Sequence, residues 1–359
     1  MSIRIGIIGA GTIGKAHAAA AVEAGQVVAT VADVDLAIAE TLASEIEGAT
    51  ASAAVDSLLS DPGLDAVYIC VPNRWHKQQA IAALEAGKDV FLEKPMGLNA
   101  QECREINAVS ANSDRILQIG MAYRYSAATQ SAKSIVESGD LGEVYHTKAH
   151  LYRQRGVPGL GGWFTTKAMS GGGPLIDLGV HLIDLVGWIT GFPRAERVSG
   201  KVYSHFGRRM ANYVYEDMWA GPPRLDGVCD VEDSAHALVH FAGGATLDLQ
   251  VSWAINLPTT NMPDNGIIAL CGDQGGLSFD LCGESVNLVT ESNGRNVDSQ
   301  VLLPEVDQLV EQATEFAKCV ETRAKPQATG EQGEQVQTII DAIYESSESC
   351  QEVALPLEG

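Results

Sequence analysis

An apolar run at the start of the chain ends in three glycines, Gly9, Gly11 and Gly14, with the spacing G-x-G-x-x-G. The run before them, residues 3–8, predicts a buried strand, and the Ala-rich stretch after them, residues 15–24, predicts a helix. A strand, a tight glycine turn and a helix in this order suit the phosphates of a dinucleotide, because the helix N-terminus offers unpaired N–H groups. We expect the whole turn to contact such a cofactor, including Thr12 and Ile13.

A second apolar run, residues 27–32, ends in Asp33, about 20 residues after the last glycine of the turn. A carboxylate at this place accepts a hydrogen bond from a free ribose 2′-hydroxyl and repels a 2′-phosphate. Asp33 is followed by Val34 and not by Arg or Lys. The sequence therefore favours NAD, with NADP less favoured. The alternative to a dinucleotide site is that residues 9–14 form a structural glycine turn in some other α/β protein.

Length, charge and cysteine content narrow the class of protein. A chain of 359 residues is long enough for two domains. Its net charge of −22 argues against nucleic acid or an anionic membrane surface as a partner. The seven cysteines are scattered and form no C-x-x-C pair, which is typical of free thiols in a reducing cytoplasm and gives no zinc motif. We expect a cytoplasmic protein without a signal peptide, a membrane span or a bound metal.

Strand and helix patterns alternate as far as residue 122 and then change. The alternation predicts a doubly wound parallel sheet of the Rossmann type in residues 1–122, the dinucleotide-binding domain. Longer alternating runs predict an α+β domain in residues 123–359, with an open, mostly antiparallel sheet. Helices are too few to cover both faces of that sheet, so we expect a homodimer or a homotetramer that buries the free face.

Two further loops follow apolar strands of the parallel sheet, where ligands of such folds bind. The first begins Val71-Pro72-Asn73 and reaches His76, and the second is Glu93-Lys94-Pro95. We expect six residues of these loops to contact the cofactor: Val71, Pro72, Asn73, His76, Glu93 and Lys94. Lys94 follows its strand directly and could stabilise negative charge on a substrate oxygen. The alternative is an ordinary exposed loop lysine.

A glycine run, residues 171–173, precedes an apolar helix that carries Asp177, His181 and Asp184 on one face. Polar groups on such a helix are costly unless they are paired. One interpretation makes His181 a general base that an adjacent carboxylate orients. The alternatives are a metal site and a buried His–Asp pair that fixes packing. Tyr152 and Trp163 flank this region and could line a pocket or belong to the core.

With these motifs in view, the chain resembles the glucose–fructose oxidoreductase / inositol dehydrogenase (Gfo/Idh/MocA) family over nearly its whole length. The resemblance implies that Lys94, Asp177 and His181 form the catalytic group and contact the substrate. It also implies that the loop with Pro72, Asn73 and His76 lies near the nicotinamide. An arginine after the sixth strand of the family is matched by Arg124, which would contact substrate.

The resemblance implies an NAD(P)-dependent dehydrogenase of a cyclic sugar or polyol, inositol- or hexose-like, that exchanges a secondary hydroxyl and a ketone. Two rivals remain. One is a glycoside-cleaving enzyme that oxidises its sugar transiently and regains its NADH. The other is a non-catalytic dinucleotide sensor that regulates a partner, although a sensor has no need of Lys94, Asp177 and His181 together.

Overall fold

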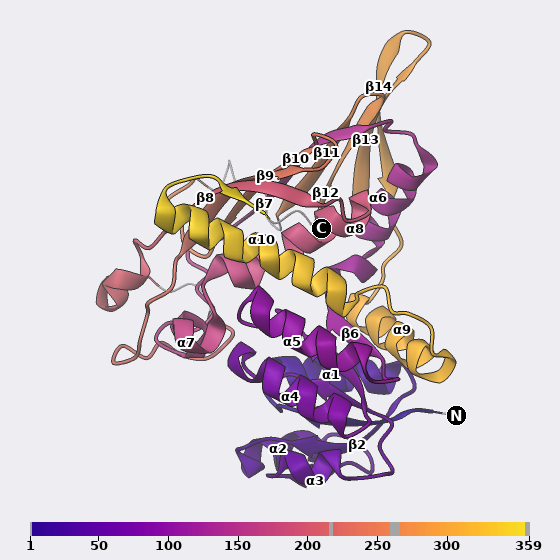
Figure 1. Cartoon of the computed structure of the whole chain (residues 1–359), viewed down its shortest axis with the longest axis vertical. Helices are drawn as coiled ribbons and strands as arrows, with labels where there is room; N and C mark the ends of the chain where they lie inside the picture. The colour runs from indigo at the N-terminus through magenta and orange to yellow at the C-terminus, as the bar shows by residue number, and fades with distance from the viewer. Residues whose placement is uncertain (1, 215–217, 259–265, 356–359) are drawn as a thin grey trace. The chain divides into compact units, whose positions relative to one another are not determined.

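The computed structural model describes residues 2–214, 218–258 and 266–355, and the chain forms two compact units (Figure 1). The first unit contains Met1–Ala122 and Asp307–Gln337, and the second contains Tyr123–Val306 and Thr338–Gly359. We expected residues 123–359 to form the second domain without interruption. The change at residue 122 falls where we placed it, but the segment Asp307–Gln337 returns to the first unit.

The first unit is built on a six-stranded sheet, sheet A, in which all strands are parallel. The strand order is β3-β2-β1-β4-β5-β6, as predicted for a Rossmann fold. The strands are β1 (Arg4–Ile8), β2 (Val27–Ala32), β3 (Thr50–Ser52), β4 (Ala66–Ile69), β5 (Asp89–Glu93) and β6 (Leu117–Gly120).

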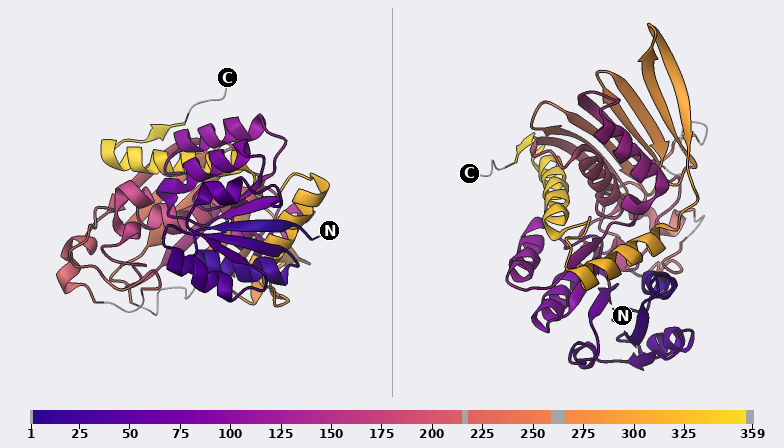
Figure 2. Two further views of the ribbon diagram at one scale, coloured as in Figure 1. Left: turned by 90° about the horizontal axis from the view of Figure 1, so that it is seen from below. Right: turned by 90° about the vertical axis from the view of Figure 1, so that its right-hand side faces the viewer.

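Helices lie on both faces of sheet A, which buries its apolar strands (Figure 2). They are α1 (Thr12–Glu23), α2 (Leu36–Ser44), α3 (Val55–Leu59), α4 (His76–Glu85), α5 (Ala100–Ala111) and α9 (Gln308–Thr322), with the short 3₁₀ turn η1 (Asn73–Trp75) before α4. The strand order runs outward in both directions from the β1–β4 pair. The loops after β1 and β4 therefore diverge at the carboxyl edge of the sheet, which is where ligands of this fold bind.

Helix α9 explains why the end of the chain belongs to the first unit. Phe316 is fully buried and its ring packs edge-on against Tyr68 and Phe91, at centroid distances of 5.3 and 5.7 Å. The buried Gln26 side chain donates a hydrogen bond of 2.8 Å to the carbonyl oxygen of Ala313. The apolar face of α9 thus completes the core on one side of sheet A. Burial of this face stabilises the association of the segment with the first unit.

The second unit is built on a nine-stranded sheet, sheet B, with the order β14-β13-β12-β11-β7-β10-β9-β8-β15. Only the β7–β10 pair is parallel among the described strands, so the sheet is mostly antiparallel, as predicted. The strands are β7 (Val144–Tyr152), β8 (Ala195–Tyr203), β9 (Ser234–Phe241), β10 (Thr246–Ser252), β11 (Ile267–Gly272), β12 (Gly275–Asp280), β13 (Ser285–Ser292), β14 (Arg295–Leu302) and β15 (Val353–Ala354).

Three helices cover one face of sheet B (Figures 1 and 2). They are α6 (Ala127–Ser138), α8 (Val180–Thr190) and the later part of α10 (Gly330–Ser349). Shorter helical segments connect the elements: η2 (Ala122–Tyr125), η3 (Trp163–Thr165), α7 (Lys167–Ser170), η4 (Leu175–Gly179) and η5 (Gly207–Asn212). Among the described residues, no helix of this unit lies on the opposite face, as the pattern predicted.

Three strands of sheets A and B were not predicted. Strand β3 has three residues and no apolar alternation, strand β14 is exposed along its whole length, and strand β15 has two residues. All three lie at the edge of a sheet, where hydrogen bonds to one neighbour suffice to form a strand. A periodicity argument depends on burial of one face, so it finds no signal in such edge strands.

One helical stretch, Lys167–Thr190, is long and apolar enough to cross a membrane by length and composition alone. In the structure 94% of its most apolar window is buried, so it is the core helix of the second unit.

Candidate functional site

The glycine turn after β1 has the geometry that the motif predicts. Gly9 has a φ of +97°, and a Cβ there would lie 2.6 Å from the carbonyl oxygen of Cys70. A Cβ on Gly14 would overlap the carbonyl oxygen of Gly9. Around Gly11, in contrast, nothing lies within 4 Å of the place where a Cβ would be. Two glycines are therefore required by close backbone packing, while the third leaves open space for a ligand.

The N-terminus of α1 fits an anionic ligand. No side chain caps this end of the helix and its first turn holds no acidic residue, while Thr12 and Ile13 are exposed. The first N–H groups of a helix have no partner within the helix, and the helix dipole favours negative charge there. With the space at Gly11, these residues fit the pyrophosphate of a dinucleotide.

Asp33 is held at the carboxyl end of β2 by two backbone amides. Its Oδ2 accepts a hydrogen bond of 2.8 Å from the N–H of Ala10, and its Oδ1 accepts one of 3.0 Å from the N–H of Asp35. These bonds fix the carboxylate beside the glycine turn. A carboxylate has about four acceptor positions, so capacity for a ribose hydroxyl remains.

His76 joins the two loops that follow β4 and β5. It is buried, its Nδ1 lies 2.6 Å from the carbonyl oxygen of Pro95, and its Nε2 lies 2.9 Å from that of Val71. Burial lowers the pKa of His76, and the two carbonyl contacts and Glu93 oppose that shift. The Lys94–Pro95 peptide bond in the second loop is cis. Through its two ring nitrogens, His76 links the backbone directly after the candidate lysine to the loop after β4.

Glu93 fastens the same turn to helix α1. Its Oε1 lies 2.6 Å from Nε2 of His17, and its Oε2 accepts a hydrogen bond of 3.0 Å from the N–H of Lys94. Burial alone would raise the pKa of Glu93, but the hydrogen bond to His17 and the nearby positive charges lower it overall. Glu93 is thus an anion that holds the backbone of Lys94 in place.

Glu93 and His76 also belong to the residues that we expect to contact the dinucleotide, and this stays a prediction. The side chains of both have partners within the first unit. In the loop before His76, Pro72 is half-buried and directly precedes the 3₁₀ turn η1, and Asn73 is buried in that turn. We now interpret Glu93 and His76 as residues that position the two loops.

His181 is exceptional within the core helix of the second unit. Every residue from 172 to 189 is buried except His181, which is half-buried. Asp177 lies in the segment η4, a single π-helical turn, and His181 lies in the first turn of α8. The regular helix that we predicted is therefore wound differently at Asp177. Turns of this kind are frequent at functional sites.

Asp177 and His181 each have an aromatic neighbour. The indole N–H of Trp253 donates a hydrogen bond of 2.9 Å to Oδ2 of Asp177. The ring of Tyr123 lies edge-on to that of His181, with centroids 4.8 Å apart. Burial raises the pKa of Tyr123; the nearby Asp177 adds to the shift, and Arg153 opposes it. Neither aromatic residue has a sequence pattern that marks it, because only the fold brings it to this helix.

Asp184 and Arg124 form a buried ion pair. The Arg124 side chain donates from Nε to Oδ2 of Asp184 at 2.8 Å and from Nη2 to Oδ1 at 2.5 Å, and both residues are fully buried. We expected Arg124 to contact substrate. Its burial and bidentate pairing instead make it a structural partner of the core helix, because each charge offsets the cost of burying the other.

Tyr152 and Trp163, our two weaker substrate candidates, have different surroundings. Alternation along β7 places Leu151 on the helix-covered face of sheet B and Tyr152 on the opposite face, where its hydroxyl contacts Gln250. Tyr152 is thereby directed away from α8, and we withdraw it as a substrate contact. Trp163 stacks on Phe164 at 3.8 Å, and Phe164 in turn lies 6.4 Å from the ring of Trp253.

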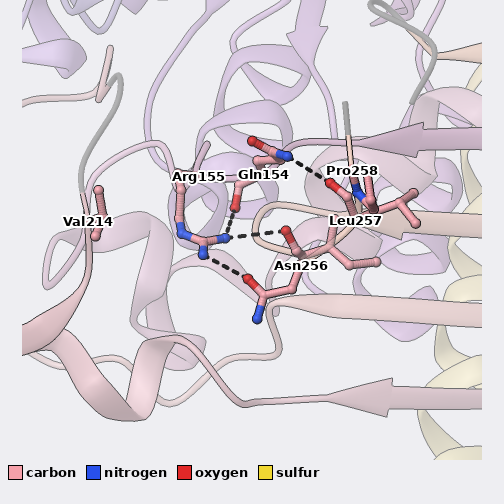
Figure 3. A pocket seen from close by; sticks show the side chains of 7 residues that line it. Gln154, Arg155, Val214, Asn256, Leu257 and Pro258 are labelled. Atoms are coloured by element: carbon pink, nitrogen blue, oxygen red, sulfur yellow. Dashed lines mark hydrogen bonds between the residues drawn. The ribbon is translucent and has the colours of Figure 1, made fainter. Parts of the chain in front are cut away.

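A pocket of about 360 Å³ lies beyond the end of β10 (Figure 3). The Arg155 guanidinium in it donates to the carbonyl oxygens of Gln154 and Ile255 and to Oδ1 of Asn256 (Figure 3). The positive charge of Arg155 is therefore bound by acceptors in the two neighbouring segments of this unit. We assign no ligand to this pocket, whose lining is Gln154, Arg155, Val214, Ile255, Asn256, Leu257 and Pro258.

The candidate residues thus fall into two sets. Lys94 and the glycine turn belong to the first unit, while Asp177, His181, Tyr123 and Trp253 belong to the second. Among residues 2–214, 218–258 and 266–355, no group of three or more His, Cys, Asp or Glu could hold a metal ion. The chemistry that these sets suit is proton transfer in the second unit and dinucleotide binding in the first.

The fold and the glycine turn together define a dinucleotide-binding oxidoreductase. The family model described as "Oxidoreductase family, NAD-binding Rossmann fold" matches residues 3–121, and the model for the GFO/IDH/MocA C-terminal domain matches residues 129–278. The chain therefore belongs to the Gfo/Idh/MocA family of oxidoreductases, as the motifs indicated.

Named relatives agree with this assignment. The chain is 29% identical to a D-glucoside 3-dehydrogenase of Escherichia coli (strain K12) over 356 residues, which covers 98% of this chain and 97% of the relative. It is 32% identical to an inositol 2-dehydrogenase of Acidothermus cellulolyticus over 281 residues, 76% of this chain and 74% of the relative. Among solved structures, a levoglucosan dehydrogenase in complex with NADH has the same fold, with a TM-score of 0.86 at 21% identity, covering 99% of this chain and 100% of that one.

The burial of His76 gives a testable pH dependence. Because the pKa of folded His76 lies below the ordinary value of 6.5, the unfolded chain binds more protons as the pH falls through that value. The free energy of unfolding of the first unit should therefore decrease on acidification. In His76→Gln, which cannot take up this proton, the melting temperature should fall less between pH 8 and pH 5.5, by on the order of a few degrees.

The measurement is thermal unfolding at several pH values for both proteins. The difference at pH 8 gives the cost of the substitution itself, and the change of that difference with pH gives the contribution of protonation. Equal pH dependence in the two proteins would show that His76 takes up its proton as readily in the folded chain.

Proposed function

We propose that this protein is an NAD-dependent dehydrogenase that oxidises a secondary hydroxyl of a cyclic sugar or polyol to a ketone, or catalyses the reverse reaction. The observation that supports this most directly is the accessible His181 in an otherwise buried helix, with Asp177 one turn before it. An accessible imidazole with a carboxylate in the preceding turn suits proton transfer near neutral pH. NAD, when bound, would supply the hydride acceptor.

Three side chains would act on the substrate in this proposal. His181 takes the proton of the reacting hydroxyl. Lys94, whose backbone Glu93 and His76 hold in place, stabilises the negative charge that develops on that oxygen. Asp177 keeps His181 in the productive orientation and stabilises the positive charge that it gains. The dinucleotide would be held by the glycine turn, the α1 N-terminus, Asp33 and the loop 71–73.

The relatives support a ring-shaped polyhydroxy substrate. Their names include D-glucoside 3-dehydrogenase, inositol 2-dehydrogenase and 1,5-anhydro-D-fructose reductase. The relative that is aligned over 98% of this chain is named for a glucoside, so glucosides are our first choice of substrate. NAD reduction should be screened across glucosides, inositols, free hexoses and anhydrosugars. No reduction with any of these classes would count against the proposal.

The two rivals predict different results in the same screen. A glycoside-cleaving enzyme would release the aglycone without net formation of NADH. A dinucleotide sensor would bind NAD and turn over none of the compounds.

The cytoplasmic location also stays a prediction, supported by the absence of a disulfide at any of the seven cysteines.

The position of Asp33 predicts a preference for NAD over NADP. A 2′-phosphate would meet a fixed carboxylate, so kcat/KM should favour NAD by at least about tenfold, the factor that corresponds to ~1.4 kcal/mol. Asp33→Ala should weaken NAD and reduce this ratio. Asp35→Ala is the matched control, since it removes the same charge from a residue that caps α2. A preference for NADP in the natural protein would contradict the argument.

Lys94 and His181 should behave as one catalytic group. His181→Ala should lower kcat about 10²–10⁴-fold, as expected for a general base, and leave the Kd of NAD nearly unchanged. Lys94→Ala should also lower kcat strongly, and the double variant should be little worse than the poorer single variant. EDTA should have no effect. If His181→Ala loses melting temperature but keeps its turnover, His181 is a packing residue and the proposal fails.

We also propose that the free face of sheet B joins a second copy of the chain. This face carries the exposed Leu238 beside half-buried residues such as His236, Ile267 and Ala269, and it spans the central strands of the sheet. A broad surface of this mixed character suits a symmetric interface in which each copy contributes the same patch.

Light scattering at micromolar concentration should show a homodimer or homotetramer. Leu238→Glu should lower the assembly state, because a symmetric contact brings like charges together. Val22→Glu on α1 introduces the same charge at a similarly exposed position of the first unit and should leave the assembly intact. An active monomer in the natural protein would refute this proposal.

A further inference from the structure

Trp253 is held rigidly where its indole meets Asp177. It follows β10, it is 1% exposed, and its indole N–H donates to Oδ2 of Asp177 at 2.9 Å. Its backbone N–H donates to the carbonyl oxygen of Asp233 at 3.0 Å, and its own carbonyl oxygen accepts from the N–H of Gly156 at 2.7 Å. With its backbone bound at both ends and its ring buried, Trp253 presents a fixed donor to the carboxylate.

The backbone of Asp177 is held from the other side by Glu232. The N–H of Asp177 donates to the carbonyl oxygen of Gly173 at 3.0 Å. One carboxylate oxygen of Glu232, Oε1, accepts hydrogen bonds from the N–H groups of Gly173 and Leu175, at 2.9 and 3.1 Å. The hydroxyl of Tyr344 donates to the same oxygen at 2.9 Å. Glu232 thus ties together both ends of the turn that leads into Asp177.

The glycines of this turn are required by the same contact. A Cβ on Gly173 would overlap the carbonyl oxygen of Glu232, and a Cβ on Gly172 would overlap the hydroxyl of Tyr344. The glycine run is therefore a close-packed turn. Its place is set by the buried carboxylate of Glu232, two residues before β9.

Glu232 and Asp233 are adjacent, so one dipeptide holds Asp177 by two routes. Glu232 binds the turn before Asp177 through its side chain, and Asp233 binds the backbone of Trp253 through its carbonyl oxygen. We infer that Trp253 and Glu232 are positioning residues for the reaction: together they fix the orientation of Asp177, and the indole N–H of Trp253 favours its ionised form. This inference rests on the proposed catalytic role of Asp177.

The hydrogen bond from Trp253 should stabilise the negative charge on Asp177. A hydrogen bond donated to a carboxylate favours the ionised form, and its removal raises the pKa of the acid. Without the indole N–H, Asp177 would be less well oriented and would take up a proton at higher pH. The loss should therefore appear in kcat and in the acid limb of the pH profile, while the affinity for NAD stays the same.

Trp253→Phe removes the donor and keeps an aromatic ring. With a glucoside that the natural enzyme turns over, kcat should fall about 10- to 100-fold, as for loss of a hydrogen bond to a charged group. The acid limb of kcat/KM should move to higher pH, with the Kd of NAD unchanged. Trp188→Phe is the matched control: Trp188 is buried in α8 of the same unit, its ring lies near Arg124 and Lys133, and both kcat and the pH profile should be retained.

Comparison with Asp177→Asn separates the inference from the proposed function. If Asp177→Asn keeps its kcat, the proposed role of Asp177 is wrong. If Asp177→Asn is impaired but Trp253→Phe retains the natural kcat and pH profile, only the positioning inference is overturned. If both are impaired, Trp253→Phe should add nothing in the Asp177→Asn background; independent, multiplying losses would overturn the inference.

Tyr344→Phe tests the second route, and it decides the matter if Trp253→Phe fails to fold. It removes one of the three hydrogen bonds at Oε1 of Glu232 and leaves a half-buried ring in place. We expect a several-fold loss of kcat at an unchanged KM for NAD. A folded Tyr344→Phe with the natural kcat and pH profile would overturn the role of Glu232.

Discussion

Buried carboxylates that are held by donors from distant parts of the chain determine the local structure of both candidate sites. Burial of a carboxylate is costly unless hydrogen-bond donors replace water. Glu93 has His17 and the backbone of Lys94, and Asp177 has Trp253. The bond between Glu93 and His17 and the bond between Asp177 and Trp253 each join elements that are far apart in sequence. The need to satisfy the buried charge therefore fixes the loop or helix that carries the candidate chemistry.

Close backbone contact is the second constraint, and glycine is the residue that permits it. Gly14 brings α1 against the turn after β1, and Gly173 brings the turn before Asp177 against Glu232. In both places a methyl group would overlap a carbonyl oxygen. The glycine motifs of the two units thus have the same physical origin, although only the first is known by its spacing. Gly11 differs from both, because it leaves space open instead of filling it.

The two units contribute different parts of the function. The first unit provides a glycine turn, an uncapped helix N-terminus and a fixed carboxylate, which together suit a dinucleotide. The second unit provides one accessible histidine on a buried helix. A polar side chain on such a helix is costly unless it is paired or reaches solvent, and His181 is half-buried with the ring of Tyr123 edge-on to its own. Membership of the Gfo/Idh/MocA family agrees with this division.

The sequence by itself determined the fold class, the family and the residues of the glycine turn, because these depend on local periodicity and on glycine spacing. It also singled out Lys94, Asp177 and His181, whose residue types and neighbours are unusual. It also assigned Arg124, Tyr152, Glu93 and His76 to ligands, whereas the structure shows the side chain of each in contact with a partner in the same chain. Whether a polar side chain meets a ligand or a partner in the same chain depends on which face of an element it occupies and on what packs there.

Only the tertiary structure decided the remaining features. The return of Asp307–Gln337 to the first unit follows from the apolar face of α9 and the core of sheet A, which no local pattern relates to each other. The contacts of Asp177 with Trp253 and of Glu232 with the glycine turn join residues 76 and 59 positions apart. Such pairings arise when strands and helices pack, and a buried charge then selects its donors from whatever the packing brings near.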